Sequence, residues 1–411
     1  MDSSPLPAGK PVASRSPEFE LLLLAARMRV DGPAAARLRA LVHEEIDWDF
    51  VITTAHRQHV LPIVARTLGA CAPEGMPEFA TRRFQHAVLG NVKRSLFLTN
   101  ELLQIIDLLN AQGIESIAYK GPVLAALVYG NVALRQFSDL DIIVRPEHVV
   151  RARTLLIARG YRPERPLSDE QLLGLMLAEK DITLLRDDLG VNLEIHWGIT
   201  TENDPIRVAP ASLWEHVASC AIGGRTVQAL PTDDLLLMLC IHGARHLWTR
   251  LGWICDVAEI TRSQKGLDWD LVMDKASRLG GARILLLGLA LARNLLGAEF
   301  PPRVIQAIEA DPVLDVLCAQ VRGWLFSEHP VPLDLGERER FLIKLREHPA
   351  DRLRVALRQA SLYLGLTARD QEALPLPPYL RWALYVLRPV RLAGQYGLTP
   401  VKRFLTGIFQ S

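Results

Sequence analysis

Apolar residues at three- and four-residue spacings dominate the first part of the chain, which is the pattern of amphipathic helices. Residues 18–110 are therefore predicted to be helical, and the longest periodic run covers 80–113, with Gly113 suited to the position beyond a helix end. Short apolar runs separated by glycine and proline follow, and they predict strands alternating with short helices. The expected elements are strand 114–120, helix 122–129, strand 140–144, helix 146–160, a short strand at 161–164, and a hairpin of strands 181–187 and 191–199.

This change of pattern predicts an α+β fold, in which a small mixed-sheet core is flanked by N-terminal and C-terminal helical regions. From Pro231 onward the helical pattern returns. The predicted organisation is a disordered leader at 1–17, an N-terminal helical region at 18–80, the core at 81–200, a C-terminal helical domain at 201–376 and a basic amphipathic tail at 377–411.

Composition narrows the class of protein. The chain has 411 residues, 49% of them hydrophobic and 23% charged, which is ordinary for a globular protein. A net charge of +1 gives no overall field that would attract nucleic acid. Five scattered cysteines without a C-x-x-C spacing indicate a reducing compartment, and the Pro/Ser-rich start lacks the apolar core of a signal peptide. We therefore expect a cytoplasmic protein with no transmembrane segment.

The C-terminal stretch 377–411 differs from the rest in charge, because it carries five basic residues and no acidic one. Its aromatic and basic residues on an apolar background would suit peripheral contact with an anionic membrane or binding to RNA. A last helix packed on the domain, with arginines reaching to solvent, explains the same pattern.

Two aspartates interrupt an apolar strand. Asp139 and Asp141 stand two residues apart, so in a strand both carboxylates leave one face while the intervening apolar residues face the core. Neighbouring carboxylates repel each other unless a cation neutralises them, and oxygen ligands favour Mg²⁺ or Mn²⁺ over zinc. The pair predicts a divalent-cation site; the alternative is a solvated acidic pair at a strand end.

Positively charged residues precede this pair. Lys120 and Gly121 join a strand to a helix, and a helix start offers free N–H groups and a partial positive charge that suit phosphate. Gly121 lacks the Cβ that would block a ligand, Arg135 offers a fork of donors, and Ser138 is a further phosphate partner. Alternatively, Arg135 forms an ion pair with Asp139, and Lys120 is a solvated strand end.

A third carboxylate follows on a later strand. In the stretch 191–197, alternation places Asn192, Glu194 and His196 on one face and the apolar residues on the other. Glu194 can therefore face the two aspartates and complete a site for two cations, which would clamp the attacking and leaving oxygens of a phosphoryl displacement.

Three stretches carry this combination of residues: "YKGPVLAALVYGNVALRQFSDLDIIV" (119–144), "LEIHWGI" (193–199) and "CIHGARHLWTRLGWICDVAEI" (240–260). A glycine before a helix, a D-x-D pair and a distant strand carboxylate resemble the DNA polymerase β-type nucleotidyltransferase superfamily. The chain more closely resembles a bacterial family of uncharacterised nucleotidyltransferases. The likeness covers roughly residues 80–260, and Lys-Gly stands where most of the superfamily has Gly-Ser.

The resemblance implies a Mg²⁺- or Mn²⁺-dependent enzyme that transfers an NMP from an NTP such as ATP to an acceptor and releases pyrophosphate. Asp139, Asp141 and Glu194 would be metal ligands and catalytic residues, with Lys120, Gly121, Arg135 and Ser138 binding the nucleotide. The acceptor class, whether small molecule, sugar, protein or RNA, stays open. Two other functions also stay open. One is a catalytically degenerate nucleotide-binding module or interaction protein, and the other is a D-x-D glycosyltransferase, which explains neither the Lys-Gly helix start nor Glu194.

Two histidines four residues apart, His242 and His246, share one helical face. This spacing can bind zinc, but no third ligand stands at a suitable spacing, so a polar face packed on the core is the preferred interpretation. His196, His246 and Asp256 are candidates for the substrate side of the cleft.

Overall fold

The structure, a computed structural model, describes residues 16–201, 204, 206–264, 266–326 and 335–347. The chain divides into two compact units, 1–331 and 332–411. The sheet and the cavity described below belong to the first unit, and helix α15 (Leu335–Lys344) belongs to the second. All but the last two residues of the predicted leader, and the whole tail 377–411, lie outside the described residues.

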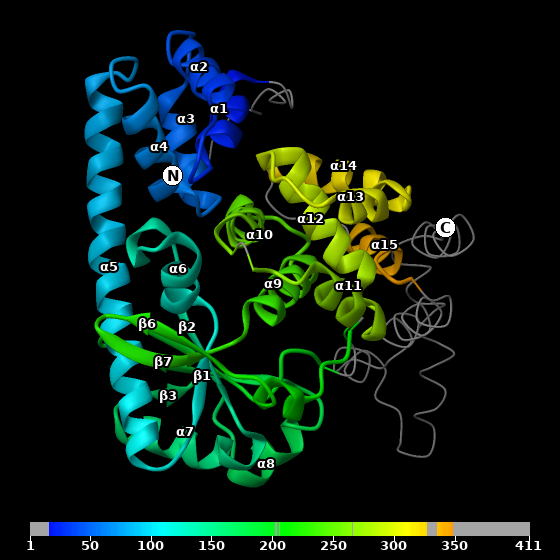
Figure 1. Cartoon of the computed structure of the whole chain (residues 1–411). Coiled ribbons are helices and arrows are strands. Elements are labelled where there is room, and N and C mark those ends of the chain that lie inside the picture. The colour runs from blue at the N-terminus through cyan, green and yellow to red at the C-terminus, as the bar shows by residue number, and fades with distance from the viewer. Residues whose placement is uncertain (1–15, 202–203, 205, 265, 327–334, 348–411) are drawn as a thin grey trace, which may run out of the picture. The chain divides into compact units, whose positions relative to one another are not determined.

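A mixed five-stranded sheet with the strand order β1-β2-β5-β4-β3 forms the centre of the first unit (Figure 1). β2 and β5 run parallel, whereas the other neighbouring strands run antiparallel. β4 and β5 form the predicted hairpin, and Gly190 makes its turn with a φ of 59°, which favours glycine. The strands are β1 (Ser116–Ala118), β2 (Asp139–Val144), β3 (Arg162–Pro163), β4 (Asp181–Arg186) and β5 (Val191–His196).

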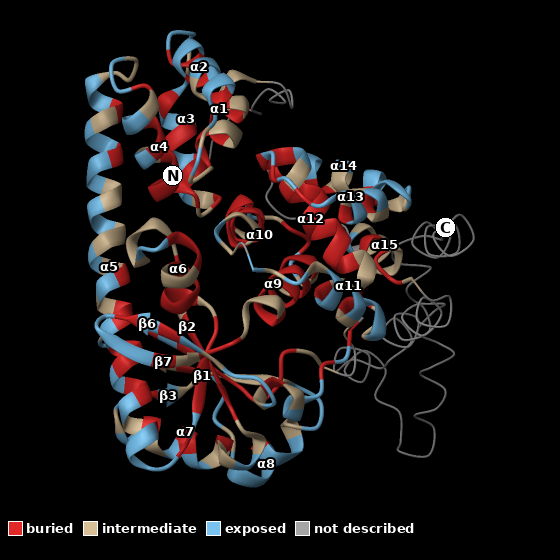
Figure 2. Ribbon diagram, in the orientation of Figure 1, coloured by how far each residue is buried: buried red, intermediate tan, exposed pale blue. Residues whose placement is uncertain are grey.

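One face of this sheet is apolar and covered. Leu140 and Ile142 of β2 and Leu193 of β5 join one hydrophobic core with residues of the long helix α5 (Glu78–Ala111) and of α7 (Val149–Ala158). Figure 2 shows these strands largely buried, whereas α5 is exposed along its outer side. Since side chains alternate along a strand, the residues between these apolar positions must point to the other face.

A second, two-stranded sheet was not anticipated from the sequence. β6 (Ala218–Ile222) and β7 (Arg225–Ala229) pair antiparallel, and β7 lies against β1. Cys220, Ile222 and Val227 belong to the same hydrophobic core as the main sheet. The hairpin therefore extends the core beyond residue 200.

Helices flank the core on both sides in sequence, so the predicted α+β class with flanking helical regions is confirmed. The N-terminal helices are α1 (Pro17–Ala25), α2 (Gly32–Leu41), α3 (Trp48–Arg57) and α4 (Leu61–Cys71). The later helices of the first unit are α9 (Thr232–Arg245), α10 (Leu251–Ser263), α11 (Trp269–Arg278), α12 (Ala282–Leu296), α13 (Pro302–Glu309) and α14 (Val313–Leu325).

The two helical regions meet beside the core. The Met28 backbone N–H donates to Glu259 of α10 at 3.1 Å, and the Cys255 thiol donates to the Ala26 carbonyl at 3.4 Å. Contacts also join α10 to α6 (Gly121–Tyr129), the helix that follows the Lys-Gly turn. α10 therefore links the N-terminal helices to the part of the core that carries the candidate site.

Two predicted elements have different bounds. The helix expected at 146–160 divides into a 3-10 turn, Pro146–His148, and α7, and the strand expected at 191–199 ends at His196. A seven-residue helix, α8 (Asp169–Leu175), precedes β4, and short 3-10 segments cover Val132–Leu134 and Pro210–Trp214. The predicted domain boundaries remain predictions.

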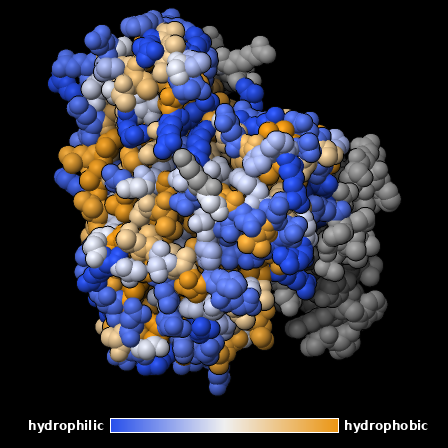
Figure 3. Space-filling model, in the orientation of Figure 1, coloured by the Kyte–Doolittle hydropathy of each residue, from blue (hydrophilic) through white to orange (hydrophobic). Residues whose placement is uncertain are grey.

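The outer side of α5 carries large apolar side chains, Phe79, Leu89 and Leu96, each about half exposed. Hydrophobic surface lies along this edge of the molecule in Figure 3. Among the described residues, no helix combines the length and hydropathy that a bilayer crossing needs.

Candidate active site

The carboxylates of β2 and β5 meet on the face of the sheet opposite α5. In the parallel register, Asp141 stands beside Glu194, and Asp139 stands beside Asn192. Side chains directly opposite on neighbouring strands share a face. The sheet therefore brings Glu194 to the two aspartates, as the alternation of the sequence predicts.

Asp141 is buried, with 4% of its surface exposed, and two cationic or hydrogen-bonding groups hold it. The Lys120 ammonium donates to Asp141 Oδ1 at 3.0 Å, and His196 Nε2 lies 3.1 Å from the same oxygen. Burial by itself would raise the pKa of Asp141, but Lys120 and His196 outweigh it and lower the pKa below its usual range. Asp141 is thus an ionised carboxylate in a buried place.

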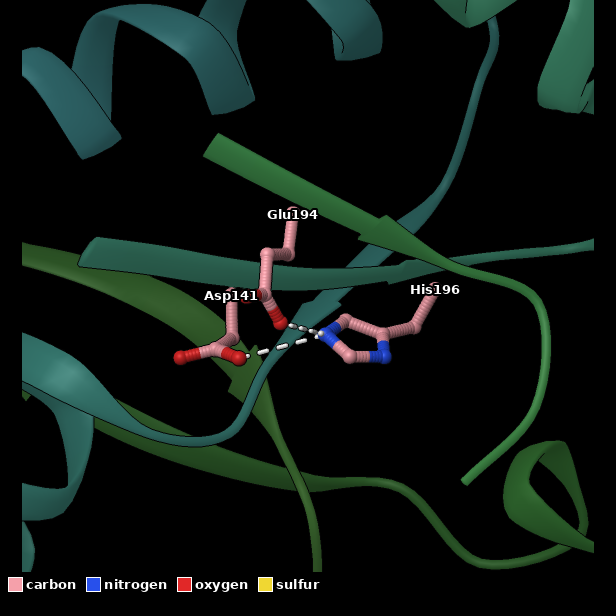
Figure 4. Close-up of side chains that lie close together, drawn as sticks. All are labelled: Asp141, Glu194 and His196. Atoms are coloured by element: carbon pink, nitrogen blue, oxygen red, sulfur yellow. Dashed lines mark hydrogen bonds and ion pairs between the residues drawn. The ribbon is translucent and has the colours of Figure 1, made fainter. Parts of the chain in front are cut away.

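Glu194 shares the same histidine. Its Oε2 lies 3.1 Å from His196 Nε2, and this hydrogen bond lowers the pKa of Glu194 against the opposing effect of burial. Figure 4 shows both carboxylates directed at one ring nitrogen of His196. Among the described residues, Asp141, Glu194 and His196 form a group whose ligand atoms all lie within 4.8 Å of one another, close enough to share a metal ion.

Asp139 lies at the edge of this group. It is partly exposed, and burial followed by the charge of Asp141 raises its pKa. Asp139 is not in the metal-ligating group that the structure brings together, whereas His196, a candidate cleft residue, is. Of the three metal ligands predicted from the sequence, Asp141 and Glu194 therefore belong to this group, and Asp139 does not.

The Lys-Gly turn positions the start of α6 beside the strand. Gly121 has a φ of 49°, and a Cβ there would lie 3.3 Å from the Asp139 carbonyl oxygen, so the backbone conformation and the close approach both favour glycine. Lys120 precedes the helix, and its side chain extends to Asp141 and over the Tyr119 ring, 5.0 Å from its centroid. The helix start and the carboxylates are therefore neighbours.

Arg135 is held by Asp256 rather than by Asp139. Its Nε and Nη2 donate to the two Asp256 oxygens at 2.9 to 3.1 Å, and the Tyr129 hydroxyl donates to Asp256 Oδ1 at 2.8 Å. Asp256 is 1% exposed. Asp256 therefore positions Arg135 from behind, and the alternative ion pair of Arg135 with Asp139 is wrong.

A cavity of about 430 Å³ opens over the carboxylates. One wall comes from the core and includes Gly121, Ser138 and Asp139, and the other comes from α9, α10 and the segment that precedes α4. Positive side chains around it are Lys120, Arg135, Lys180, Arg245 and Arg250, and acidic ones are Asp139, Asp141, Asp181 and Glu194. Of the candidate cleft residues, His246 lines the cavity, whereas His196 lies beneath it and Asp256 behind it.

A scan against protein-family models matches residues 44–297, well over half of the chain, to a family described as an uncharacterised nucleotidyltransferase. The chain belongs to this family. The resemblance to a family of uncharacterised nucleotidyltransferases, drawn from residues 119–144, 193–199 and 240–260, is therefore confirmed. The matched span also takes in α3, α4 and the whole of α12. A search of curated proteins finds no match.

The cavity also contains residues that the sequence did not single out. Lys180 and Asp181 form an ion pair at the start of β4, across from His196 in the hairpin register. Burial, and then the positive charges of Arg245 and Lys120, lower the pKa of Lys180 to about 8. The sequence contained a signal for Asp181, because the predicted hairpin with its turn near Gly190 pairs position 181 with position 196.

The wall of the cavity opposite the sheet is aromatic and basic. The rings of His242, His246 and Trp253 lie with centroids 4.6 to 5.3 Å apart, and the Arg250 guanidinium lies 5.2 Å from the Trp253 centroid. Burial holds the pKa of His242 well below its usual value. Within the described residues, neither histidine joins a group of three metal-ligating side chains.

Proposed function

We propose that this protein is a divalent-cation-dependent nucleotidyltransferase that moves an NMP from an NTP to an acceptor and releases pyrophosphate. The observation that carries the proposal is the parallel pairing of Asp141 with Glu194 beside the start of α6, inside a cavity with both acidic and basic walls. Family membership supports the same class of reaction.

The donor set fits a divalent cation. Asp141 is ionised and buried, Glu194 is held close to it, and Asp139 lies next to both on the open side. Oxygen ligands of this kind suit Mg²⁺ or Mn²⁺. When bound, the cation would neutralise charge on the phosphates and on the reacting oxygens.

The protein's own groups would position the triphosphate. Lys120, the Gly121 amide, Ser138 and Lys180 line the cavity from the core, and Arg245 lines it from α9. A triphosphate between them would meet fixed positive charge from both walls, and preorganised charge of this kind stabilises the charge that develops on the leaving pyrophosphate. Arg135, held by Asp256, would contribute from a fixed place.

The acceptor would enter beside Glu194, the most exposed carboxylate of the metal-ligating group. Glu194 would accept a proton from the attacking hydroxyl or phosphate. The aromatic wall of His246 and Trp253 offers planar surfaces for a base or for a cyclic acceptor.

The test uses the full chain with each of the four NTPs labelled at the α-phosphate, with Mg²⁺ or Mn²⁺. It is run without an added acceptor, with total RNA, and with a small-molecule extract. Label transfer with pyrophosphate release that is lost in Asp139→Ala and Asp141→Asn supports the proposal. A matched control is Asp187→Asn, because Asp187 is an exposed residue that follows β4.

Two other outcomes overturn the proposal. Saturable, cation-dependent NTP binding without pyrophosphate release under any of these conditions indicates a degenerate binding module. Release of sugar from a UDP- or GDP-sugar, with no transfer from an NTP, indicates a glycosyltransferase.

A further inference from the structure

His196 is the most buried member of the acidic group, with 1% of its surface exposed. Its Nε2 lies 3.1 Å from Asp141 Oδ1 and 3.1 Å from Glu194 Oε2 (Figure 4). The Tyr119 hydroxyl oxygen lies 3.4 Å from the same nitrogen. One ring nitrogen carries at most one proton, which makes one well-directed hydrogen bond. Asp141 Oδ1 also accepts from the Lys120 ammonium at 3.0 Å, but a single imidazole proton cannot serve both carboxylate oxygens, whereas a shared cation can bind both.

The separations fit such a cation. Ligand atoms on adjacent corners of an octahedral site with bonds of about 2.1 Å are separated by about 3.0 Å. Both nitrogen-to-oxygen separations of 3.1 Å are close to this value. The imidazole nitrogen is thus spaced from each carboxylate oxygen as two ligands of one ion are, and the two oxygens lie within 4.8 Å of each other.

The other nitrogen of the ring gives independent support. His196 Nδ1 is buried and makes no hydrogen bond in the structure, and Asp181 Oδ2 lies 3.4 Å from it. The β4–β5 register places Asp181 directly opposite His196, and Lys180 holds the Asp181 carboxylate in an ion pair. A carboxylate behind the distal nitrogen is the usual partner of a metal-ligating histidine, because it fixes the ring and its tautomer.

We propose that His196 Nε2 is a metal ligand together with Asp141 and Glu194, and that Asp181 is a positioning residue behind it. This inference rests on the cation of the proposed function and gives that site a mixed nitrogen and oxygen ligand set. An imidazole ligand moves the preference from Mg²⁺, which favours oxygen, towards Mn²⁺. The site is therefore expected to bind Mn²⁺ more tightly than Mg²⁺.

The experiment measures Mn²⁺ binding to the full chain without nucleotide, so its result does not depend on turnover. Pulsed electron paramagnetic resonance on protein labelled with ¹⁵N-histidine reports whether an imidazole nitrogen is bound to Mn²⁺. Titration calorimetry gives the Mn²⁺ and Mg²⁺ affinities. We expect nitrogen coupling in the wild type and Mn²⁺ binding at least about tenfold tighter than Mg²⁺ binding.

Variants assign the coupling to a residue. His196→Gln should lose it, and His196→Asp should lose it while keeping a bound cation and a smaller preference for Mn²⁺. His242→Gln, a cavity histidine outside the acidic group, should keep it. Asp181→Asn should keep the coupling but weaken Mn²⁺ binding by about 10- to 100-fold, as losses behind a ligating histidine do.

Three results overturn the inference. The first is a wild type that binds no Mn²⁺, and the second is bound Mn²⁺ without nitrogen coupling. The third is coupling that persists in a folded His196→Gln or His196→Asp variant. Because the wild-type spectrum decides the second result alone, the test holds even where a variant does not fold. Failure of nucleotidyl transfer with intact Mn²⁺–histidine coupling would instead count against the proposed function.

Discussion

Asp141 on β2 stands directly beside Glu194 on β5, and these two strands run parallel within the main sheet. Parallel neighbours place equivalent side chains on the same face at the same height, so two carboxylates from distant parts of the sequence meet. Lys120 and His196 hold Asp141 in its ionised form within this pair. The predictions below follow from this arrangement and from the groups around it.

Lys120 competes with a metal cation for Asp141, because its ammonium donates to Asp141 Oδ1 at 3.0 Å. Lys120→Met should therefore bind Mn²⁺ alone more tightly than the wild type. The same variant should show a KM for NTP raised by about tenfold, since a positive charge beside the triphosphate is lost. Calorimetry and steady-state kinetics measure the two effects, with the exposed Lys93→Met as the control. A Lys120→Met variant that binds both Mn²⁺ and NTP more weakly, or both more tightly, would contradict this role.

Gly121 is required by its backbone conformation. Gly121→Ala should destabilise the fold by about 1–2 kcal/mol, because φ is 49° and the new Cβ would press on the Asp139 carbonyl oxygen. Gly90→Ala is the matched control, since Gly90 lies in α5 with open space around it and should gain about 0.5–1 kcal/mol. Urea unfolding measures both. Equal effects of the two substitutions would show that the turn is not strained.

Asp256 has a structural role behind the cavity. Asp256→Asn leaves the Arg135 guanidinium buried beside a neutral group, and the expected loss is about 3–5 kcal/mol of folding stability. Glu20→Gln, which breaks an ion pair with Arg37 at the surface, should have little effect. Thermal and urea unfolding measure the difference. If Asp256→Asn lost no more folding stability than Glu20→Gln, the ion pair with Asp256 would not be what holds Arg135.

His59 gives the fold a dependence on pH. Burial, followed by the charges of Arg250 and Arg135, lowers the pKa of His59 to about 4 from the usual 6.5. The unfolded chain therefore takes up a proton before the folded one, so stability is full above pH 6.5 and falls as the pH drops towards 4. His59→Asn removes this group, and asparagine tolerates the positive φ found there.

Between pH 7.5 and pH 5 the wild type should lose about 1–2 kcal/mol more folding stability than His59→Asn. Urea unfolding at the two pH values gives the comparison, and the exposed His43→Asn serves as the control. The same pH-dependent loss in the wild type and in His59→Asn would mean that His59 titrates normally.

Local pattern was sufficient for the strands that carry the carboxylates. Alternation of apolar and polar residues predicted the faces of β2 and β5, and the turn near Gly190 predicted the hairpin. The same reasoning could have found the β6–β7 hairpin. Its strands also alternate, with Cys220 and Ile222 facing the core before the Gly223–Gly224 turn.

Contacts between distant segments could not be predicted from the sequence alone. Nothing local pairs Arg135 with Asp256, 121 residues later, or places α9 and α10 over the carboxylates. His196 was assigned to the cleft because it shares a face with Glu194. Its burial beneath the cavity depends on what covers that part of the sheet, and the alternation of apolar and polar residues does not predict this.

The most direct measurement is a crystal structure of the full chain with Mn²⁺ and a non-hydrolysable NTP, using the anomalous signal of manganese. The account predicts a peak within about 2.5 Å of Asp141 and Glu194 oxygens, with the triphosphate reaching towards Gly121 and Lys120. A nucleotide and manganese bound away from the β2–β5 pair would contradict it.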